Sequence, residues 1–299
     1  MKWKKLGCLF NVCNLSPKLL SHASNPLALH LKANVFRVFY SGRDCSNKSS
    51  VGFVDLDVCL RRVVSVCDTP IAGFGTPGSY YSHGISVGCS IELGEKHQLL
   101  FMGWQIPDGE HWFGEIGSLS LSSEMNAAEV EPLALMTRDD EDPISLSYPW
   151  VIYDGGSYKM WYGSTVSWET KNGEMLHVIK YATSKDGNNW KRQGIAIPYE
   201  IGVAQAFSRP TVIKQRSGYH MWFSYRSGSG TKYRIGYAFS YDGVVWERKY
   251  KSGIDVSDDG WDSEMVCYPF VFEHKGEIYM LYNGNGYGES GFGLAVLQE

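Results

Sequence analysis

The sequence lacks the features that mark zinc-binding, membrane-spanning and nucleic-acid-binding proteins. Its seven cysteines include no Cys-x-x-Cys pair, and no Cys/His cluster has the spacing of metal ligands, so we expect no metal site. No run reaches the roughly 18 apolar residues of a membrane helix. The formal net charge of -4 gives no general attraction to nucleic acid or to anionic membranes. We therefore expect neither a nucleic-acid partner nor membrane insertion.

Other signals are missing as well. An odd number of cysteines without close pairs fits a reduced, cytoplasmic protein, in which most thiols act as small buried hydrophobes. The apolar stretch Leu6–Phe10 is too short for the core of a signal peptide. No helix is expected after any Gly-x-Gly pattern, so we expect no phosphate-binding loop and no cofactor.

What the chain does contain is a repeat. The segment from Tyr181 to Trp190 returns as the segment from Tyr237 to Trp246, with Ser-x-Asp-Gly-x-x-Trp in both copies. Ahead of each copy stand an apolar run and a Met-Trp pair. The same template places five leading residues 63, 60, 61 and 59 residues apart, namely Pro26, Cys89, Pro149, Pro210 and Pro269. Five units of nearly constant length thus account for the whole chain.

Each unit reads as four short strands, because apolar and aromatic stretches alternate with Asp-Gly, Gly-Gly and Lys-Gly turn signals. The fourth unit shows the pattern most clearly, with strands predicted at Thr211–Lys214, Tyr219–Ser224, Tyr233–Ser240 and Trp246–Lys249. Four strands per unit, repeated radially, predict an all-β fold that is a five-bladed β-propeller.

We predict a single domain over residues 1–299, with blades at about 21–65, 83–130, 145–198, 206–250, and 264–299 together with 1–10. The last unit ends after three strands. The segment Met1–Gly7 resembles Asn189–Gly194, which is the outer strand of the third unit. We therefore expect the N-terminal strand to join the C-terminal blade and to close the ring. The alternative is an ordinary edge strand elsewhere.

In such a propeller, the loops that enter the innermost strands and the loops between the second and third strands open on one mouth of the central channel. Function is expected where loops converge on a rigid scaffold. Arg43, Arg209 and Arg226 fall in these loops, and guanidinium groups match phosphate or carboxylate, so an anionic ligand is predicted. The alternative is that the arginines pair with Asp44, Asp262 and Glu264 as struts between blades.

Other polar and aromatic residues fall in the same loops. His22 and His83 are candidate ligand-binding residues, with structural histidines as the alternative. Tyr148 and Tyr268 are candidate stacking platforms or packing residues, and Asn285 belongs to a polar loop that either binds a ligand or forms a tight turn.

The five-unit layout, the Ser-x-Asp-Gly-x-x-Trp turns and the Arg43-Asp44 pair resemble the five-bladed propeller superfamily of sugar enzymes, which includes β-fructosidases, arabinanases and mannoside phosphorylases. Within it, the chain is most similar to uncharacterised bacterial polysaccharide-locus proteins and to the propeller domain of inositolphosphorylceramide glucosamine transferases. The resemblance implies a sugar or sugar-phosphate ligand, for which Asn25, Tyr148, Tyr268 and Asn285 would shape the site.

The chain differs from this superfamily in the positions of its acidic residues. Hydrolases of the group commonly carry an acid just before the inner-strand proline, whereas this sequence has Asn25, Gly88, Tyr148, Arg209 and Tyr268 in that slot. Asp44 and Glu264 remain as candidate catalytic acids. A two-carboxylate hydrolase is therefore weakened, and a phosphorylase or transferase is favoured, because phosphate can act as the nucleophile.

The resemblance thus implies an enzyme that acts on glycosidic bonds, by hydrolysis, phosphorolysis or transfer, in bacterial glycan or surface-polysaccharide metabolism. The competing hypothesis is a non-catalytic carbohydrate-binding or scaffold propeller, which would explain the missing acids. The sugar, the linkage and the oligomeric state stay open.

Overall fold

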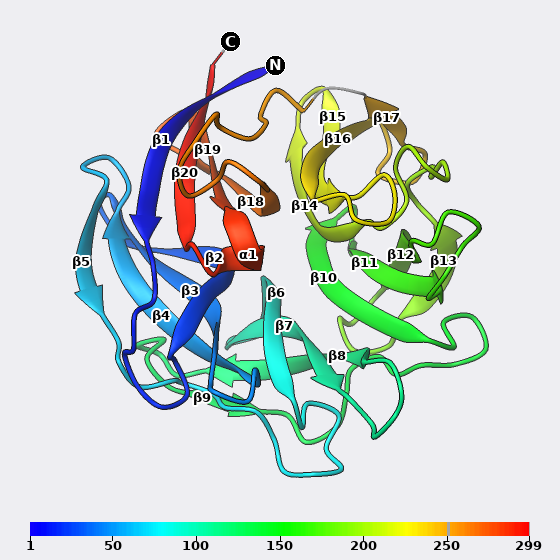
Figure 1. Cartoon of the computed structure of the whole chain (residues 1–299), viewed down its shortest axis with the longest axis horizontal. Coiled ribbons are helices and arrows are strands. Elements are labelled where there is room, and N and C mark those ends of the chain that lie inside the picture. Colours follow the sequence, from blue (N-terminus) through cyan, green and yellow to red (C-terminus); the bar gives the residue numbers. More distant parts are fainter. Residues whose placement is uncertain (250–251, 299) are drawn as a thin grey trace.

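The protein is built almost entirely of β-strands (Figure 1). The structure, a computed structural model, describes residues 1–249 and 252–298. The all-β class predicted from the sequence is confirmed. The expected blade limits at residues 250 and 299 lie outside the described residues. Within the described part, no helix has the length and apolar character needed to cross a membrane.

Three sheets contain four antiparallel strands each. The third repeat forms β10 (Ser145–Asp154), β11 (Ser157–Ser167), β12 (Leu176–Ser184) and β13 (Lys191–Ile195). The fourth repeat forms β14 (Ser208–Gln215), β15 (Gly218–Tyr225), β16 (Arg234–Ser240) and β17 (Glu247–Lys249). The last sheet joins β18 (Cys267–His274), β19 (Glu277–Asn283) and β20 (Phe292–Gln298) to the N-terminal strand β1 (Lys2–Phe10). The predicted pairing of the N-terminal segment with the last strand is therefore found.

The first two repeats share a larger sheet. The first contributes β2 (Ser21–Lys32), β3 (Val35–Arg43), β4 (Ser49–Asp57) and β5 (Arg62–Val66). The second contributes β6 (Gly84–Leu93), β7 (Lys96–Gln105), β8 (Phe113–Leu121) and β9 (Ala128–Val130). One parallel pair, Ser49 with Gly84, joins the two halves. Figure 1 shows the sheets following one another around a central axis, with the two termini side by side and the short helix α1 (Asn285–Gly288) near the middle.

The innermost strands share an irregularity just before their proline. In β2, β10, β14 and β18 the ladder shifts register at this point. The residue before the proline has a positive φ, which non-glycine residues rarely adopt. These values are 57° at Asn25, 39° at Tyr148, 46° at Arg209 and 53° at Tyr268. Such bulges release backbone groups from the ladder and leave them available to other partners.

Neighbouring repeats are tied together by side chains at the end of the second strand, each of which accepts a backbone N–H from the inner strand of the next repeat. These bonds join Ser41 Oγ to Val87 N (3.1 Å), Ser224 Oγ to Tyr268 N (2.7 Å) and Asn283 Oδ1 to Asn25 N (2.9 Å). The last of them links the fifth repeat to the first. The inner strands are thus held in register with one another around the axis.

Two buried acids, Asp142 and Asp262, are paired with cations. Asp142 lies 2.7 Å from Nζ of Lys180 and 2.7 Å from Nε of Arg192. Burial alone would raise the pKa of Asp142, but these cations and two hydroxyl donors lower it. Asp262 lies 2.7 Å from Nζ of Lys5. The alternative in which Asp262 pairs with a mouth arginine is therefore wrong.

Candidate functional site

A cavity of about 440 Å³ opens where the inner strands begin. Its lining includes residues from the starts of all five inner strands and from the connections between second and third strands. The polar lining consists of serines, two asparagines, one histidine and two arginines, and the remainder is mainly aromatic. No carboxylate lies among the described lining residues. Of the predicted site residues, Asn25, Arg43, Tyr148, Arg226 and Tyr268 line this cavity.

Arg209 lies beneath the cavity, with its side chain almost completely buried. Its two terminal nitrogens donate to backbone carbonyls of three other repeats, and Nε donates to Val87 O (3.5 Å). The terminal acceptors are Asn25 O (3.1 Å), Pro26 O (2.8 Å), Gly88 O (3.4 Å), Tyr268 O (3.2 Å) and Pro269 O (3.0 Å). Arg209 is therefore a strut.

The strut differs from the predicted one, because its partners are carbonyls and not acids. The positive φ at position 209 belongs to the same irregularity that frees these carbonyls from their ladders. Burial lowers the pKa of Arg209 to about 10, which leaves the guanidinium charged at neutral pH. Its donors are occupied, so the structure contradicts the prediction that Arg209 binds an anionic ligand.

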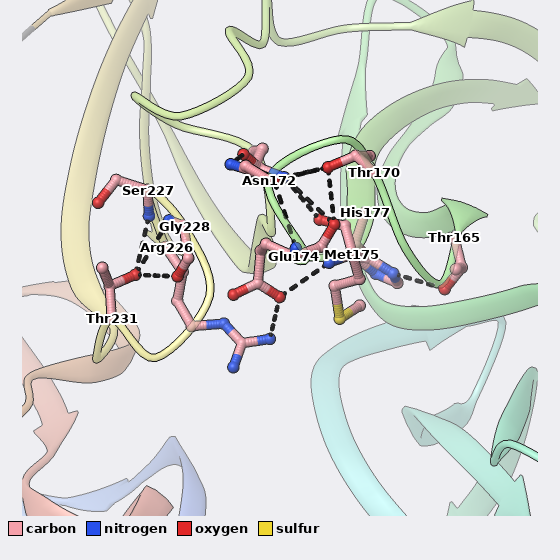
Figure 2. Close-up of polar contacts among 11 residues, drawn as sticks. Thr165, Thr170, Asn172, Glu174, Met175, His177, Arg226, Ser227, Gly228 and Thr231 are labelled. Atoms are coloured by element: carbon pink, nitrogen blue, oxygen red, sulfur yellow. Dashed lines mark hydrogen bonds and ion pairs between the residues drawn. The ribbon is translucent and has the colours of Figure 1, made fainter.

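Arg226, at the end of the second strand of the same repeat, is held differently. Its Nη2 donates to Oε1 of Glu174 over 2.9 Å (Figure 2). Its guanidinium lies 5.0 Å from the ring centre of Tyr233. Its Nε is buried without a hydrogen-bond partner. The side chain is thus fixed by a carboxylate and a ring while one donor beside the cavity stays unused.

The connection that carries Glu174 is itself held in place by Gln205, which is fully buried. The side-chain nitrogen of Gln205 donates to Thr170 Oγ1 (3.1 Å) and Met175 O (3.2 Å), and its oxygen accepts from Asn172 Nδ2 (2.7 Å). The backbone N–H of Gln205 bonds to the carbonyl of Arg226 (3.0 Å). Gln205 therefore fixes both halves of the ion pair, through its side-chain amide on the Glu174 side and through its backbone N–H on the Arg226 side.

His177 lines the cavity next to this pair, and the sequence had not indicated it. Its Nε2 lies 2.8 Å from Ser147 Oγ and its Nδ1 lies 2.8 Å from Thr165 Oγ1. Burial, with the nearby Arg226, lowers the pKa of His177 to about 3. The imidazole is neutral at physiological pH. A side chain at Gly163 would clash with both Ser147 and His177, which explains the glycine.

The first repeat contributes Arg43, whose Nη1 donates to Asn47 Oδ1 over 2.5 Å. Asp44 does not line the cavity. Its Oδ1 accepts the backbone N–H groups of Ser46 and Lys48, each over 2.8 Å, so it holds a turn. This is the alternative role that the sequence left open for Asp44.

Glu264 and Asn285 also lie outside the lining. The Glu264 side chain is exposed, while its backbone N–H bonds to Asn285 Oδ1 over 2.8 Å. The Asn285 amide donates to Gly260 O (3.1 Å), so this residue organises the loop before β18. The cavity therefore does not bring Asp44 and Glu264 together as a catalytic pair.

The two predicted histidines, His22 and His83, are not among the residues that line the cavity. His22 has its Nδ1 2.8 Å from Ser21 Oγ, and burial, together with Arg43, lowers its pKa to about 4. Nδ1 of His83 accepts the backbone N–H of Ile106 over 3.2 Å. Both hydrogen-bond to their surroundings as structural histidines do. The described residues contain no cluster of His, Cys, Asp and Glu side chains that could hold a metal ion.

Four tyrosines form one wall of the cavity. Ring centres lie 5.7 Å apart for Tyr148 and Tyr268, 6.1 Å for Tyr233 and Tyr268, and 5.9 Å for Tyr233 and Tyr287. Burial raises the pKa of both Tyr148 and Tyr268, so their hydroxyls stay protonated. Beside them, Asn25 Oδ1 is buried without a hydrogen-bond partner. The wall offers flat apolar faces together with an unused acceptor.

Comparison with known proteins places the chain among uncharacterised relatives. No model of a known protein family matches it. It is 40% identical over 301 residues to the uncharacterized protein Rv1502 of Mycobacterium tuberculosis H37Rv, covering 100% of both chains. The uncharacterized protein MT1551 of the strain CDC 1551 is similar to the same extent.

Solved structures with a similar fold include glycoside hydrolases. One has a TM-score of 0.76 at 14% identity and covers 99% of this chain and 92% of its own. A putative glycoside hydrolase from Parabacteroides distasonis gives 0.72 at 12% identity, covering 98% and 95%. The β-fructofuranosidase BmSUC1 of Bombyx mori gives 0.64 at 12% identity, covering 96% of this chain and 62% of its own. These likenesses confirm a glycoside hydrolase-like, propeller-type fold.

Proposed function

This chain belongs to the family of the Mycobacterium tuberculosis proteins Rv1502 and MT1551, and we propose that it binds an anionic sugar in the cavity at the mouth of the fold. The anionic group is a phosphate or a carboxylate. Arg43 and Arg226 supply the positive charge, the tyrosine wall takes a sugar face, and the serines and Asn25 meet hydroxyls.

The single observation that carries the proposal is that two residues lining this cavity, Arg226 and Asn25, each have a buried polar atom without a hydrogen-bond partner. Arg226 Nε is a buried donor without an acceptor, and Asn25 Oδ1 is a buried acceptor without a donor. Leaving a buried polar group unpaired costs about 1–3 kcal/mol. A sugar hydroxyl donates as well as accepts, and an anionic oxygen accepts from a guanidinium, so an anionic sugar satisfies both atoms.

The finer architecture that we propose is a single domain of five blades, with the limits predicted from the sequence. Three repeats form separate four-stranded sheets, and one pair of residues joins the two halves of the larger sheet. The pairing of β1 with β20, together with the bond from Asn283 to Asn25, supports closure of the ring between the last blade and the first.

Glycosyl transfer is a second candidate function, favoured by Glu174. Its Oε1 is occupied by Arg226 and by the N–H of Met175, whereas no described residue bonds its Oε2. In phosphorolysis, Glu174 would first take up a proton on Oε2 and pass it to the leaving oxygen, as the bond to that oxygen breaks and a phosphate oxygen bonds to the anomeric carbon. Two-carboxylate hydrolysis has no support, because Asp44 holds a turn, the Glu264 side chain is exposed, and Glu174 itself lies outside the residues that line the cavity.

The setting that we propose is glycan metabolism in the bacterial cytoplasm. The relatives from Mycobacterium tuberculosis support the bacterial setting. All seven cysteines are free, which fits a reducing compartment.

A thermal-shift screen tests the proposed function. The panel contains phosphate, sugar phosphates, uronic acids, nucleotide sugars and neutral oligosaccharides. An anionic sugar at a hundredfold excess over its Kd should raise the Tm by about 5 °C. Arg43→Ala and Arg226→Ala should abolish this rise, whereas Arg62→Ala, on the exposed strand β5, should preserve it. Stabilisation by neutral sugars alone, unaffected by either mouth substitution, would contradict the proposal.

A further inference from the structure

We infer that the ligand extends out of the cavity and that a second, uncharged sugar ring binds on an aromatic rim formed by Trp112 and Trp168. This inference rests on the proposed function and deepens it: the ligand is a glycan of at least two residues, with its charge in the cavity and a neutral ring on the rim.

The rim begins where the cavity ends. Trp112 lines the cavity from the connection between β7 and β8. Its ring centre lies 5.0 Å from that of Trp168, which belongs to the connection between β11 and β12, with the ring planes at 72°. His111 stacks on Trp168 at 4.7 Å and 19°. Two connections from different repeats therefore build one aromatic surface that continues the cavity wall.

The indole N–H groups of the tryptophans in the sheets fall into two sets. Those of Trp150, Trp161, Trp190 and Trp246 each bond to a backbone carbonyl, whereas those of Trp3 and Trp222 are buried without a partner. Trp112 and Trp168 are half-buried, and within residues 1–249 and 252–298 their indole N–H groups have no acceptor. An apolar face beside a free donor suits a sugar ring, which presents C–H groups on its faces and hydroxyls at its edge.

The charge of the rim is opposite to that of the cavity. Asp108, Glu110 and Glu169 lie in the same two connections and are exposed, and Lys171 is the cation among them. The cavity lining, by contrast, has two arginines and no carboxylate among its described residues. An anionic second group would be repelled at the rim, so the second ring is neutral. For the same reason a diphosphate linker, as in a nucleotide sugar, does not suit this position.

Isothermal titration of matched probes tests the inference. The first pair is glucose 6-phosphate and maltose 6′-phosphate, and the second is glucuronate and cellobiouronic acid. Each disaccharide adds one neutral ring to its monosaccharide. Stacking on an aromatic side chain should make the Kd of a disaccharide about tenfold lower than that of its monosaccharide.

Trp168→Ala should remove this advantage and leave the Kd of the monosaccharide within about twofold. Tyr241→Ala is the matched control, because Tyr241 is an exposed aromatic residue in the turn between β16 and β17, outside the cavity lining. It should change neither Kd. Unchanged Tm values for both variants would show that the fold is intact.

Four results would overturn the inference. Equal affinities within both pairs, or equal weakening of monosaccharide and disaccharide by Trp168→Ala, would exclude a second sugar site while leaving the proposed function standing. If Trp168 lowers the Kd of UDP-glucuronate but not that of the disaccharides, a nucleobase and not a sugar ring occupies the rim. If no anionic probe binds, the proposed function fails, and the second site fails with it.

Discussion

Arg209 and Arg226 come from the same sheet and have opposite surroundings. Arg209 forms the floor beneath the cavity, where its donors meet carbonyls from three other repeats. Arg226 belongs to the wall, where one carboxylate holds it and Nε stays unused. The comparison teaches that residue type alone does not identify an anion site. An arginine saturated by carbonyls supports structure, and an arginine positioned with a donor to spare supports binding.

Removing the floor arginine is the strongest test of this contrast. Arg209→Met should lower the free energy of unfolding by at least about 3 kcal/mol, because several buried carbonyls lose their donors. Urea unfolding measures the loss, and Arg62→Met is the surface control. A change below about 1 kcal/mol would mean that the floor does not need its cation.

Removing the wall arginine should act on binding instead. Arg226→Met should weaken binding of an anionic sugar by about 10- to 100-fold, since a charge-assisted hydrogen bond is lost, and should cost less stability than Arg209→Met. Titration calorimetry and urea unfolding separate the two effects.

Glu174→Gln is the companion variant, because it keeps the amide oxygen as an acceptor for Arg226 and removes the competing charge. It should preserve or strengthen binding of the anion. If Glu174 handles a proton in glycosyl transfer, the same variant should bind and lose turnover. Weaker binding in Glu174→Gln than in Arg226→Met would contradict the assignment of Arg226 as the anion-binding residue.

The buried, neutral imidazole of His177 makes the stability of the folded protein depend on pH. The pKa of His177 falls from its ordinary 6.5 to about 3 in the folded protein, so between these values the unfolded chain binds the extra proton. Stability should therefore fall by up to about 1.4 kcal/mol per pH unit as pH drops below about 6.

His177→Gln should flatten that part of the curve relative to the native protein. Asp142 acts in a lower window, since its pKa is lowered from 3.8 and its contribution is lost only in stronger acid. Parallel curves for the native protein and His177→Gln between pH 6 and 4 would contradict the buried, neutral state of His177.

The smallest effects are expected at the acids outside the lining. Asp44→Asn and Glu264→Gln should each leave the affinity for an anionic sugar within about twofold, because neither side chain lines the cavity and solvent and salt screen charges near the surface. Titration of both variants checks this. If either variant loses more than tenfold in affinity or turnover, the substituted acid does take part in the functional site.

The sequence predicted the parts of this fold that depend on local pattern. The repeat spacing located the inner strands, and the predicted strands of the fourth repeat match β14 to β17 within a few residues. The slot before the inner proline was also recognised as equivalent in all repeats. What could not be predicted is the direction of its side chain, because a positive φ at Arg209 depends on carbonyls supplied by residues far away in the chain.

The site shows the same division. Arg43 and Arg226 could be placed at the mouth, because both end a second strand. Glu174 and His177 were missed as individual residues. The available signal for them was the long connection between β11 and β12, which interrupts the otherwise compact repeat. Their partners come from other repeats, so only the folded arrangement reveals them.

The carbonyl-bound cation also bears on how the chain assembles. Its acceptors lie 121 to 184 positions before it or about 60 after it in the chain. None of these contacts can form until distant segments have met, so they appear late in folding and are lost together. Units that contact only their neighbours can fray one by one from an end. Because Arg209 connects distant repeats, the whole chain should unfold in a single cooperative transition.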